Sequence, residues 1–178
     1  MKTRNLLLTA LFAAFTIVFA QLVVPLPFTP VQISLSIMGA FLSGLLLGPK
    51  YGALSQLVYL LLAVVGLPVL GKFTGGVGAL LGPTGGYVIA YPIMAFFAGY
   101  FWDRFGKKTF VGSLPGMLLG LAVCYVIGTI WLSVSAKMGI YQAFLAGVAP
   151  FLVFDLVKIV CCGWIARLFL KRTHLFVR

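Results

Sequence analysis

The stretch Phe151-Leu152-Val153-Phe154-Asp155-Leu156-Val157-Lys158-Ile159-Val160 places two opposite charges inside the last hydrophobic segment of the chain. Asp155 is one of only two acidic residues, and Lys158 follows it three positions later. On a helix, positions i and i+3 share a face, so both side chains are expected on the same side. A charge near the centre of a membrane costs about 2.5–3.5 kcal/mol. The pair is therefore a candidate functional site, with a structural ion pair between helices as the alternative.

The chain around this stretch has the composition of an integral membrane protein. Of its 178 residues, 62% are hydrophobic and only 8% are charged, more apolar surface than a soluble domain can bury. Its apolar runs are each about as long as a helix that crosses ~30 Å of hydrocarbon. We predict an all-α protein with one transmembrane domain (residues 1–178) and six helices, at about 6–24, 31–47, 51–67, 86–101, 114–134 and 144–170.

Basic residues predict the orientation of these helices. With six crossings, one side carries ten lysines and arginines and the other carries only Lys72 and Lys137. The ten are Lys2, Arg4, Lys50, Arg104, Lys107, Lys108, Arg167, Lys171, Arg172 and Arg178. Positive charge collects on the cytoplasmic side of membrane proteins, so both termini are predicted to be cytoplasmic. The net charge of +11 is thus an orientation signal, and nucleic-acid binding is not expected.

Catalysis, metal binding and nucleotide binding are not expected either. The sequence has no cluster of histidines, cysteines or carboxylates that could hold a metal. Gly66–Phe73 matches G-x-x-x-x-G-K, but it lacks the following Ser or Thr and comes after a membrane helix. A single intramembrane carboxylate excludes paired-carboxylate chemistry. We therefore predict a protein that is not an enzyme and has no cofactor.

The predicted outer loop Pro68–Gly86 is rich in glycine and longer than an ordinary helix connection, which is typical of a binding loop or lid. If the last helix begins at Pro150, Asp155 and Lys158 lie about 8–12 Å below its outer end, under this loop. These features predict a pocket with one acceptor and one cation, roofed by the loop. Gln32, Ser34 and Ser36 would fan around the axis of a helix, so we do not expect all three on one surface.

The run Gly75-Gly76-Val77-Gly78-Ala79-Leu80-Leu81-Gly82-Pro83-Thr84-Gly85-Gly86-Tyr87 resembles the signature of the BioY family of biotin transporters. These are the biotin-specific substrate-binding (S) components of energy-coupling factor (ECF) transporters. Phe28–Val31, Gly44–Ala53 and Phe154–Lys158 also fit, so the resemblance spans essentially the whole chain. Ser36 stands where we would expect a glutamine in this family.

The resemblance implies high-affinity biotin binding and uptake by an S-component-like bundle in a prokaryotic cell membrane. By this analogy Lys158 holds the carboxylate of biotin and Asp155 its ureido N–H groups, with Tyr87, Thr74, Gly75, Gly76 and Thr84 completing the site. Ala10 and Ala14, spaced as A-x-x-x-A, would dock the transmembrane coupling subunit, which joins two cytoplasmic ATPases.

Two other functions remain open from the sequence. The first is an S component for another vitamin or small heterocycle. The second is a structural membrane scaffold, in which the charged pair clamps two helices together.

Overall fold

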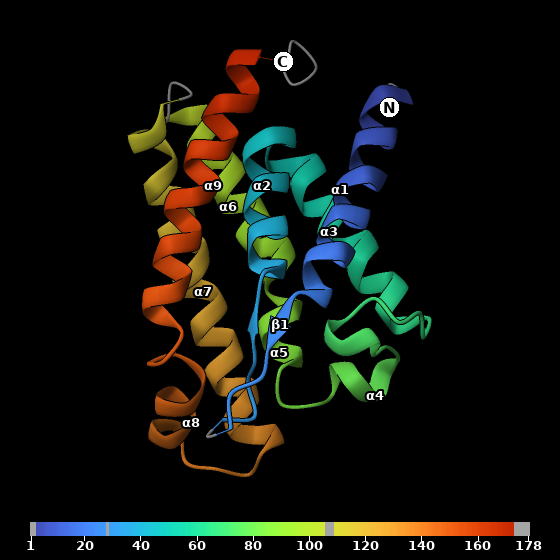
Figure 1. Ribbon diagram of the computed structural model, residues 1–178, viewed down its shortest axis with the longest axis vertical. Coiled ribbons are helices and arrows are strands. Elements are labelled where there is room, and N and C mark those ends of the chain that lie inside the picture. Colours follow the sequence, from blue (N-terminus) through green and yellow to red (C-terminus); the bar gives the residue numbers. More distant parts are fainter. Residues whose placement is uncertain (1–2, 28, 106–108, 173–178) are drawn as a thin grey trace.

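Long helices dominate a computed structural model of the chain, which describes residues 3–27, 29–105 and 109–172 (Figure 1). Each of the six predicted segments overlaps one of them: α1 (Thr3–Gln21), α2 (Ser36–Leu47), α3 (Pro49–Val64), α6 (Tyr91–Arg104), α7 (Phe110–Ser135) and α9 (Leu152–Arg172). Shorter elements lie between them: β1 (Val23–Val24), β2 (Ile33–Ser34), the 3-10 turn η1 (Gly71–Phe73), α4 (Val77–Leu80), α5 (Gly85–Ile89) and α8 (Ile140–Gly147).

Length and hydropathy single out α1 and α7 as helices that could each cross a membrane unaided. The bent pair α8 and α9 forms a third candidate span, with an angle of 50° between its two helices. Pro150 lies at this bend, where its ring and missing N–H are incompatible with a continuous helix. The segment predicted at 144–170 is therefore two helices, which begin at Ile140 and Leu152.

The first two predicted helices have different ends in the structure. The helix predicted at 6–24 ends at Gln21, and the one predicted at 31–47 begins only at Ser36. The chain between them forms an antiparallel hairpin with Val23 opposite Ser34. Pro25, Pro27 and Pro30 explain this difference, because three prolines in six residues exclude a helix. Phe28, in the same segment, lies outside the described residues.

A break also divides the segment predicted at 86–101. Helix α5 ends at Ile89 and α6 begins at Tyr91, with Pro92 in its first turn. Pro49 occupies the same kind of position at the start of α3, after Gly48 with φ of 83°. Proline fits the first helical turn because its missing N–H would have no helical partner there. Helix α3 thus begins at Pro49, two residues before the start predicted at 51.

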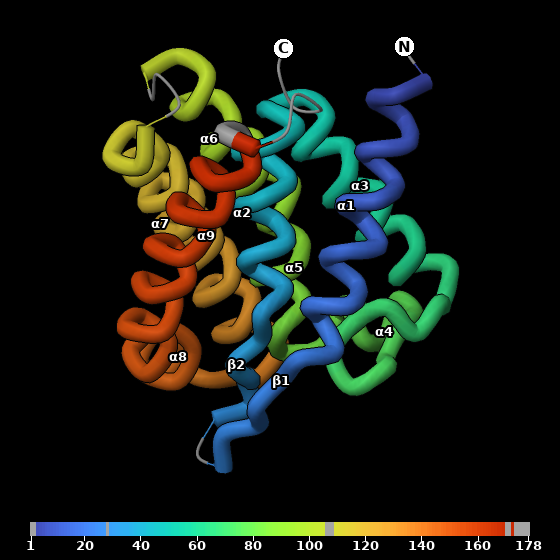
Figure 2. Tube along the Cα trace, turned by 45° about the horizontal axis from the view of Figure 1, so that its top comes forward, coloured from blue at the N-terminus to red at the C-terminus, as the bar shows by residue number. Residues whose placement is uncertain are grey.

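The bundle has two unlike ends. The start of α1, the turn between α2 and α3 and the end of α9 lie at one end, whereas the hairpin, α4 and α8 lie at the other (Figure 1). Between these ends, α9 packs against α2 and α7, and α1 packs against α2 and α3 (Figure 2). The short elements are thus gathered at one end, which we call the hairpin end.

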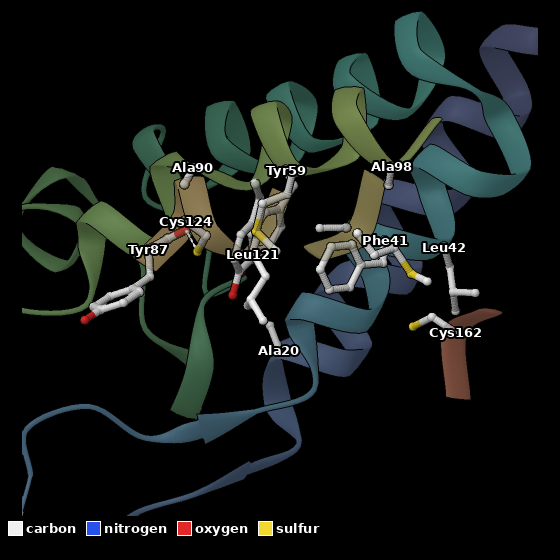
Figure 3. Close-up of a cluster of buried hydrophobic side chains, with 14 of the residues drawn as sticks. Ala20, Phe41, Leu42, Tyr59, Tyr87, Ala90, Ala98, Leu121, Cys124 and Cys162 are labelled. Atoms are coloured by element: carbon white, nitrogen blue, oxygen red, sulfur yellow. Dashed lines mark hydrogen bonds between the residues drawn. The ribbon is translucent and has the colours of Figure 1, made fainter. Parts of the chain in front are cut away.

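Small residues bring the central helices into close contact. A side chain at Gly44 of α2 would collide with the backbone of Ala95 in α6, and one at Gly120 of α7 would press on Met94. These contacts agree with the role that small residues play at helix interfaces in membranes. In the same core, the Cys124 thiol donates to the carbonyl of Tyr87 at 3.6 Å, which ties α7 to α5 (Figure 3).

Candidate ligand-binding site

A cavity with about 800 Å³ of empty space, part of it open to the outside, is lined by residues of the hairpin end and the helices next to it. Five of the residues that we predicted for the site line it: Thr74, Thr84, Tyr87, Asp155 and Lys158.

Asp155 and Lys158 are in direct contact on α9, with 2.7 Å between Lys158 Nζ and Asp155 Oδ1. Lys158 Nζ also donates to the backbone carbonyl of Ser34 at 2.8 Å, and the Tyr125 hydroxyl donates to Asp155 Oδ2 at 2.7 Å. Only 8% of the lysine side chain and 3% of the aspartate side chain are exposed. The pair thus joins α9 to β2 and α7, and it is charged, buried and part of the cavity wall.

The pair lies closer to the start of its helix than we predicted. Helix α9 begins at Leu152 rather than at Pro150. At 1.5 Å per residue, Asp155 is therefore about 5 Å and Lys158 about 9 Å along the helix axis.

The extended segment before α2 supplies a second wall of the cavity. Gln32, Ser34 and Ser36 all line it, so the expectation that they would face different ways is wrong. Gln32 and Ser34 lie in and beside the extended strand β2, where alternate residues point to the same side, and Ser36 lines the cavity from the first turn of α2. Ser34 Oγ lies 2.9 Å from Ser36 Oγ, which lies 2.6 Å from Tyr91 Oη. This wall therefore carries a chain of three hydroxyl groups.

The glycine-rich segment forms the third wall, with more regular structure than a flexible loop. Gly71 and Thr74 line the cavity from η1 and its end, and the Gln21 side chain holds this region in place. Gln21 Oε1 accepts from the backbone N–H of Phe73 at 2.9 Å, and Gln21 Nε2 donates to the carbonyl of Val69 at 3.3 Å. The end of α1 is thus tied to this wall of the cavity.

Gly75 and Gly76 were predicted for the site but are not among the residues that line the cavity. They pack instead on the end of α3. The N–H of Gly76 donates to the carbonyl of Ala63 at 2.7 Å, and a side chain at Gly75 would collide with the carbonyl of Leu67. Gly76 has a φ of 89°, which favours glycine. Gly75 and Gly76 therefore shape the loop and do not line the cavity.

Thr84 and Gly85 line the cavity at the start of α5. Trp131 of α7 fixes this region, because its indole N–H donates to the carbonyl of Gly82 at 3.0 Å. The same side chain packs so closely on Gly86 that a Cβ there would collide with it. The glycines of this part of the signature therefore allow close packing of α5 on α7.

Tyr87 lines the cavity and is largely buried. Its hydroxyl lies near the hydroxyl of Thr129, but neither makes a hydrogen bond of good geometry with the described residues. These two buried hydroxyls therefore have hydrogen-bonding capacity that the described residues do not use.

Three further tyrosines line the cavity: Tyr59, Tyr91 and Tyr125. Sequence reasoning missed them, since a tyrosine in an apolar helix is indistinguishable from a packing residue. It also missed Gln32 and Ser34, for which a signal existed. Polar residues at alternate positions directly after prolines indicate an extended strand rather than a helix.

The predicted docking face on α1 is exposed. Ala10 and Ala14 are exposed, whereas Ala13 between them is buried in the bundle. The A-x-x-x-A spacing is therefore not used for packing inside the described chain.

Comparisons with known proteins show which family the chain belongs to. Residues 1–174 match the model of the BioY family. A probable biotin transporter BioY of Pyrococcus horikoshii is 46% identical over 158 residues, which cover 89% of this chain and 91% of the relative. The biotin transporter BioY of Thermotoga maritima is 37% identical, with coverage of 92% and 94%.

The comparison with solved structures agrees with the comparison of sequences. The crystal structure of the S-component for biotin from an ECF-type ABC transporter superposes with a TM-score of 0.90 at 34% identity, covering 99% of this chain and 97% of the other. The S component of another bacterial ECF transporter matches with a TM-score of 0.51 at 18% identity, which indicates a shared fold alone. The match of a family model to almost the entire sequence, together with this fold, shows that the chain belongs to the BioY family.

Proposed function

We propose that this protein is the membrane-embedded, biotin-binding S component of an ECF-type vitamin transporter. The support comes from the relatives named biotin transporters, from the likeness to an S-component for biotin, and from the cavity. The cavity combines apolar and aromatic walls with a buried ion pair and several hydroxyl groups. Such a lining suits a ligand with an apolar middle and hydrogen-bonding ends, as biotin has.

The proposed ligand site consists of Asp155, Lys158, Tyr87, Thr74 and Thr84, with Gly75 and Gly76 shaping the loop beside it. The observation that carries the proposal is the buried Asp155–Lys158 pair, which lines an open cavity instead of being enclosed by packed helices. Charged groups inside membrane segments are expensive, and those that line a cavity mark substrate pathways.

We further propose that the chain crosses the membrane six times, with both termini in the cytoplasm. An even number of crossings is supported by α1 beginning and α9 ending at the same end of the bundle (Figure 1). The same end has most of the positive charge among the described residues: Arg4, Lys50, Arg104, Arg167 and Arg172, against Lys72 and Lys137 near the hairpin end. The side chains of Lys2, Lys107, Lys108, Lys171 and Arg178, also used in the prediction, lie outside the described residues.

The exposed face around Ala10 and Ala14 is the proposed contact for the transmembrane coupling subunit, which would connect this chain to two ATPases. Small residues at this spacing let a second helix approach closely in a membrane. Replacing Ala14 with leucine should prevent this approach and lower the amount of coupling subunit that co-purifies. Biotin binding by the isolated chain should not change, since Ala14 does not line the cavity.

Ligand binding by the purified protein tests the main proposal. The chain in lipid nanodiscs is titrated calorimetrically with biotin and with a panel of other vitamins. We expect saturable binding of biotin in a one-to-one ratio and no comparable heat with the other vitamins. Tight binding of a different vitamin would assign the chain to that ligand, and the absence of any binding would favour a scaffold.

A further inference from the structure

Residues 70–74, which we call the left-handed turn, contain two side-chain-bearing residues in a backbone conformation that favours glycine. Lys72 and Phe73 have φ values of 60° and 55°. In this region the Cβ atom comes too close to the following carbonyl oxygen, so residues other than glycine are disfavoured there. The turn therefore depends on other contacts to keep its conformation.

This conformation decides which residues of the turn reach the cavity. Gly71 and Thr74, on either side of the left-handed pair, line the cavity, whereas Lys72 and Phe73 between them do not. Both residues of the pair are exposed, Phe73 to 72%. Gly71 also packs so closely on Gln32 of the second wall that a Cβ there would collide with the amide of Gln32. A relaxed turn would thus displace Gly71 and Thr74 from the cavity wall.

Gln21, the last residue of α1, bonds to the backbone inside the turn and directly before it. Its Oε1 accepts from the N–H of Phe73 at 2.9 Å, and its Nε2 donates to the carbonyl of Val69 at 3.3 Å. The same Nε2 also donates to the carbonyl of Ile17 at 3.3 Å, which fixes the amide to its own helix. Gln21 is not among the residues that line the cavity, so these bonds act on the wall and not on a ligand.

Two further hydrogen bonds lie within the turn itself. The N–H of Leu70 donates to the carbonyl of Thr74 at 2.9 Å, and the hydroxyl of Thr74 donates to the carbonyl of Gly71 at 2.9 Å. These bonds close the turn on itself, whereas the bonds from Gln21 fix the turn to the helix bundle.

We propose that Gln21 is a positioning residue for ligand binding, which holds the left-handed turn in the conformation that places Gly71 and Thr74 in the cavity wall. A binding-competent state that is only partly populated lowers the apparent affinity in proportion to its population. Loss of Gln21 therefore weakens binding without removing any contact to the ligand. This inference rests on the proposed function, since biotin is the ligand whose affinity is measured.

The first test is Gln21→Leu, which keeps a similar volume and removes both hydrogen bonds to the segment 69–74. We expect biotin affinity in nanodiscs to fall about tenfold, as for the net loss of one to two hydrogen bonds. Amide hydrogen exchange in residues 69–74 should become faster, because the N–H of Phe73 loses its acceptor. Unchanged biotin affinity would overturn the inference.

The matched control is Thr9→Val, a polar-to-apolar substitution on the same helix. The Thr9 hydroxyl donates to the carbonyl of Asn5 within α1 at 2.7 Å, and Thr9 does not line the cavity. This substitution should change neither biotin affinity nor hydrogen exchange in the turn.

A second substitution at Phe73 distinguishes positioning from a general loss of stability. Glycine adopts the left-handed region readily, so Phe73→Gly added to Gln21→Leu should restore most of the lost affinity. Phe73→Ala removes the same exposed ring but keeps a Cβ, so it should not restore affinity. Equal affinities of the two double variants would overturn the inference, because the left-handed backbone would then not be what Gln21 holds.

Gln21→Asn covers the case in which Gln21→Leu does not fold. Asparagine remains polar, but it is one methylene group shorter and should not keep both bonds to the turn. We expect affinity to fall about threefold or more, with faster exchange in residues 69–74. Wild-type affinity in this variant, with faster exchange, would overturn the inference.

Failure of the proposed function gives a different result. In that case the wild-type chain does not bind biotin, whereas failure of the inference alone leaves biotin binding intact in the wild type and in Gln21→Leu.

Discussion

Two buried polar clusters in this bundle differ in their charge and in whether they line the cavity. The ion-pair site consists of Asp155, Lys158, Tyr125 and the carbonyl of Ser34, and it lines a cavity. The other, which we call the Gln56 cluster, lies where α1, α2 and α3 meet. Gln56 Nε2 lies 3.1 Å from each of three hydroxyl oxygens, those of Thr16, Ser43 and Ser55.

The Gln56 cluster is neutral, fully buried and not part of the cavity lining. Each of its three hydroxyls also donates to a backbone carbonyl of its own helix, at 2.8–2.9 Å. Gln56 therefore adds a hydrogen bond to each of three hydroxyls that already have a partner. These bonds link α1, α2 and α3. The comparison indicates that a polar residue in an apolar helix marks a ligand site when it is charged and borders open space.

Removing one charge of the ion-pair site should have the largest effect. Asp155→Asn leaves Lys158 buried without a counter-charge, so we expect a loss of about 3–5 kcal/mol in the free energy of unfolding. Biotin affinity should fall about a hundredfold, as a charged acceptor is lost. Calorimetric titration and thermal unfolding in the same detergent measure both.

The double variant Asp155→Asn with Lys158→Met is the control for that experiment. It removes both charges, so stability should return close to that of the wild type while biotin binding stays weak. A double variant that remains as unstable as Asp155→Asn would contradict the account of the unpaired charge.

Substitution in the Gln56 cluster should show the reverse pattern. Gln56→Met keeps a similar volume and removes hydrogen bonds that average about 0.6 kcal/mol each in membrane helices. It also removes Gln56 Oε1, which has no hydrogen-bond partner among the described residues. We expect a net destabilisation of about 1 kcal/mol and biotin affinity within twofold of wild type. A large loss of affinity would show that the two clusters are coupled.

Tyr125→Phe separates charge from hydrogen bonding within the ion-pair site. The ring remains in the cavity wall, but Asp155 Oδ2 loses the hydroxyl that lies 2.7 Å away. We expect about a tenfold loss of biotin affinity, from the net value of a hydrogen bond to a charged group. Unchanged affinity and stability would mean that Lys158 alone positions the carboxylate of Asp155.

Within the cavity wall, the smallest effect on affinity is expected at Ser36, the middle hydroxyl of the chain that leads to Tyr91. Ser36→Ala removes its contacts with Ser34 Oγ and Tyr91 Oη and leaves the backbone of the extended segment intact. A neutral hydrogen bond contributes about 0.5–1.5 kcal/mol, so affinity should fall about two- to tenfold. Ser43→Ala, in the Gln56 cluster, is the matched control and should leave affinity unchanged.

The sequence predicted the long helices well because each depends on a local property, the length of an apolar run. It predicted their ends poorly near prolines. The helix predicted at 31–47 starts five residues later, at Ser36, because hairpin pairing with Val23 and Val24 stabilises an extended backbone. The same extended backbone brings Gln32 and Ser34 into the cavity, and Ser36 lines it from the first turn of α2.

Asp155 and Lys158 could be predicted from sequence alone, since two charges three residues apart in an apolar helix stand out and share a face. The glycine-rich signature indicated where the cavity wall would form, through Thr74, Thr84 and Tyr87. The sequence could not separate these residues from Gly75 and Gly76. The difference lies in contacts at and just after the end of α3: the N–H of Gly76 donates to the carbonyl of Ala63, and a side chain at Gly75 would collide with the carbonyl of Leu67.

The sequence by itself determined that this protein lies in a membrane, that its bundle is helical and that one charged pair would be its most unusual feature. These conclusions follow from hydropathy and helical periodicity, which are properties of neighbouring residues. Only the tertiary structure decided that Lys158 contacts Asp155 and Ser34, that Tyr125 completes the site, and that Gln56 does not belong to it. Those facts depend on which segments meet in the folded chain: the contact between Lys158 and Ser34 joins residues 124 positions apart, and the contact between Tyr125 and Asp155 joins residues 30 positions apart.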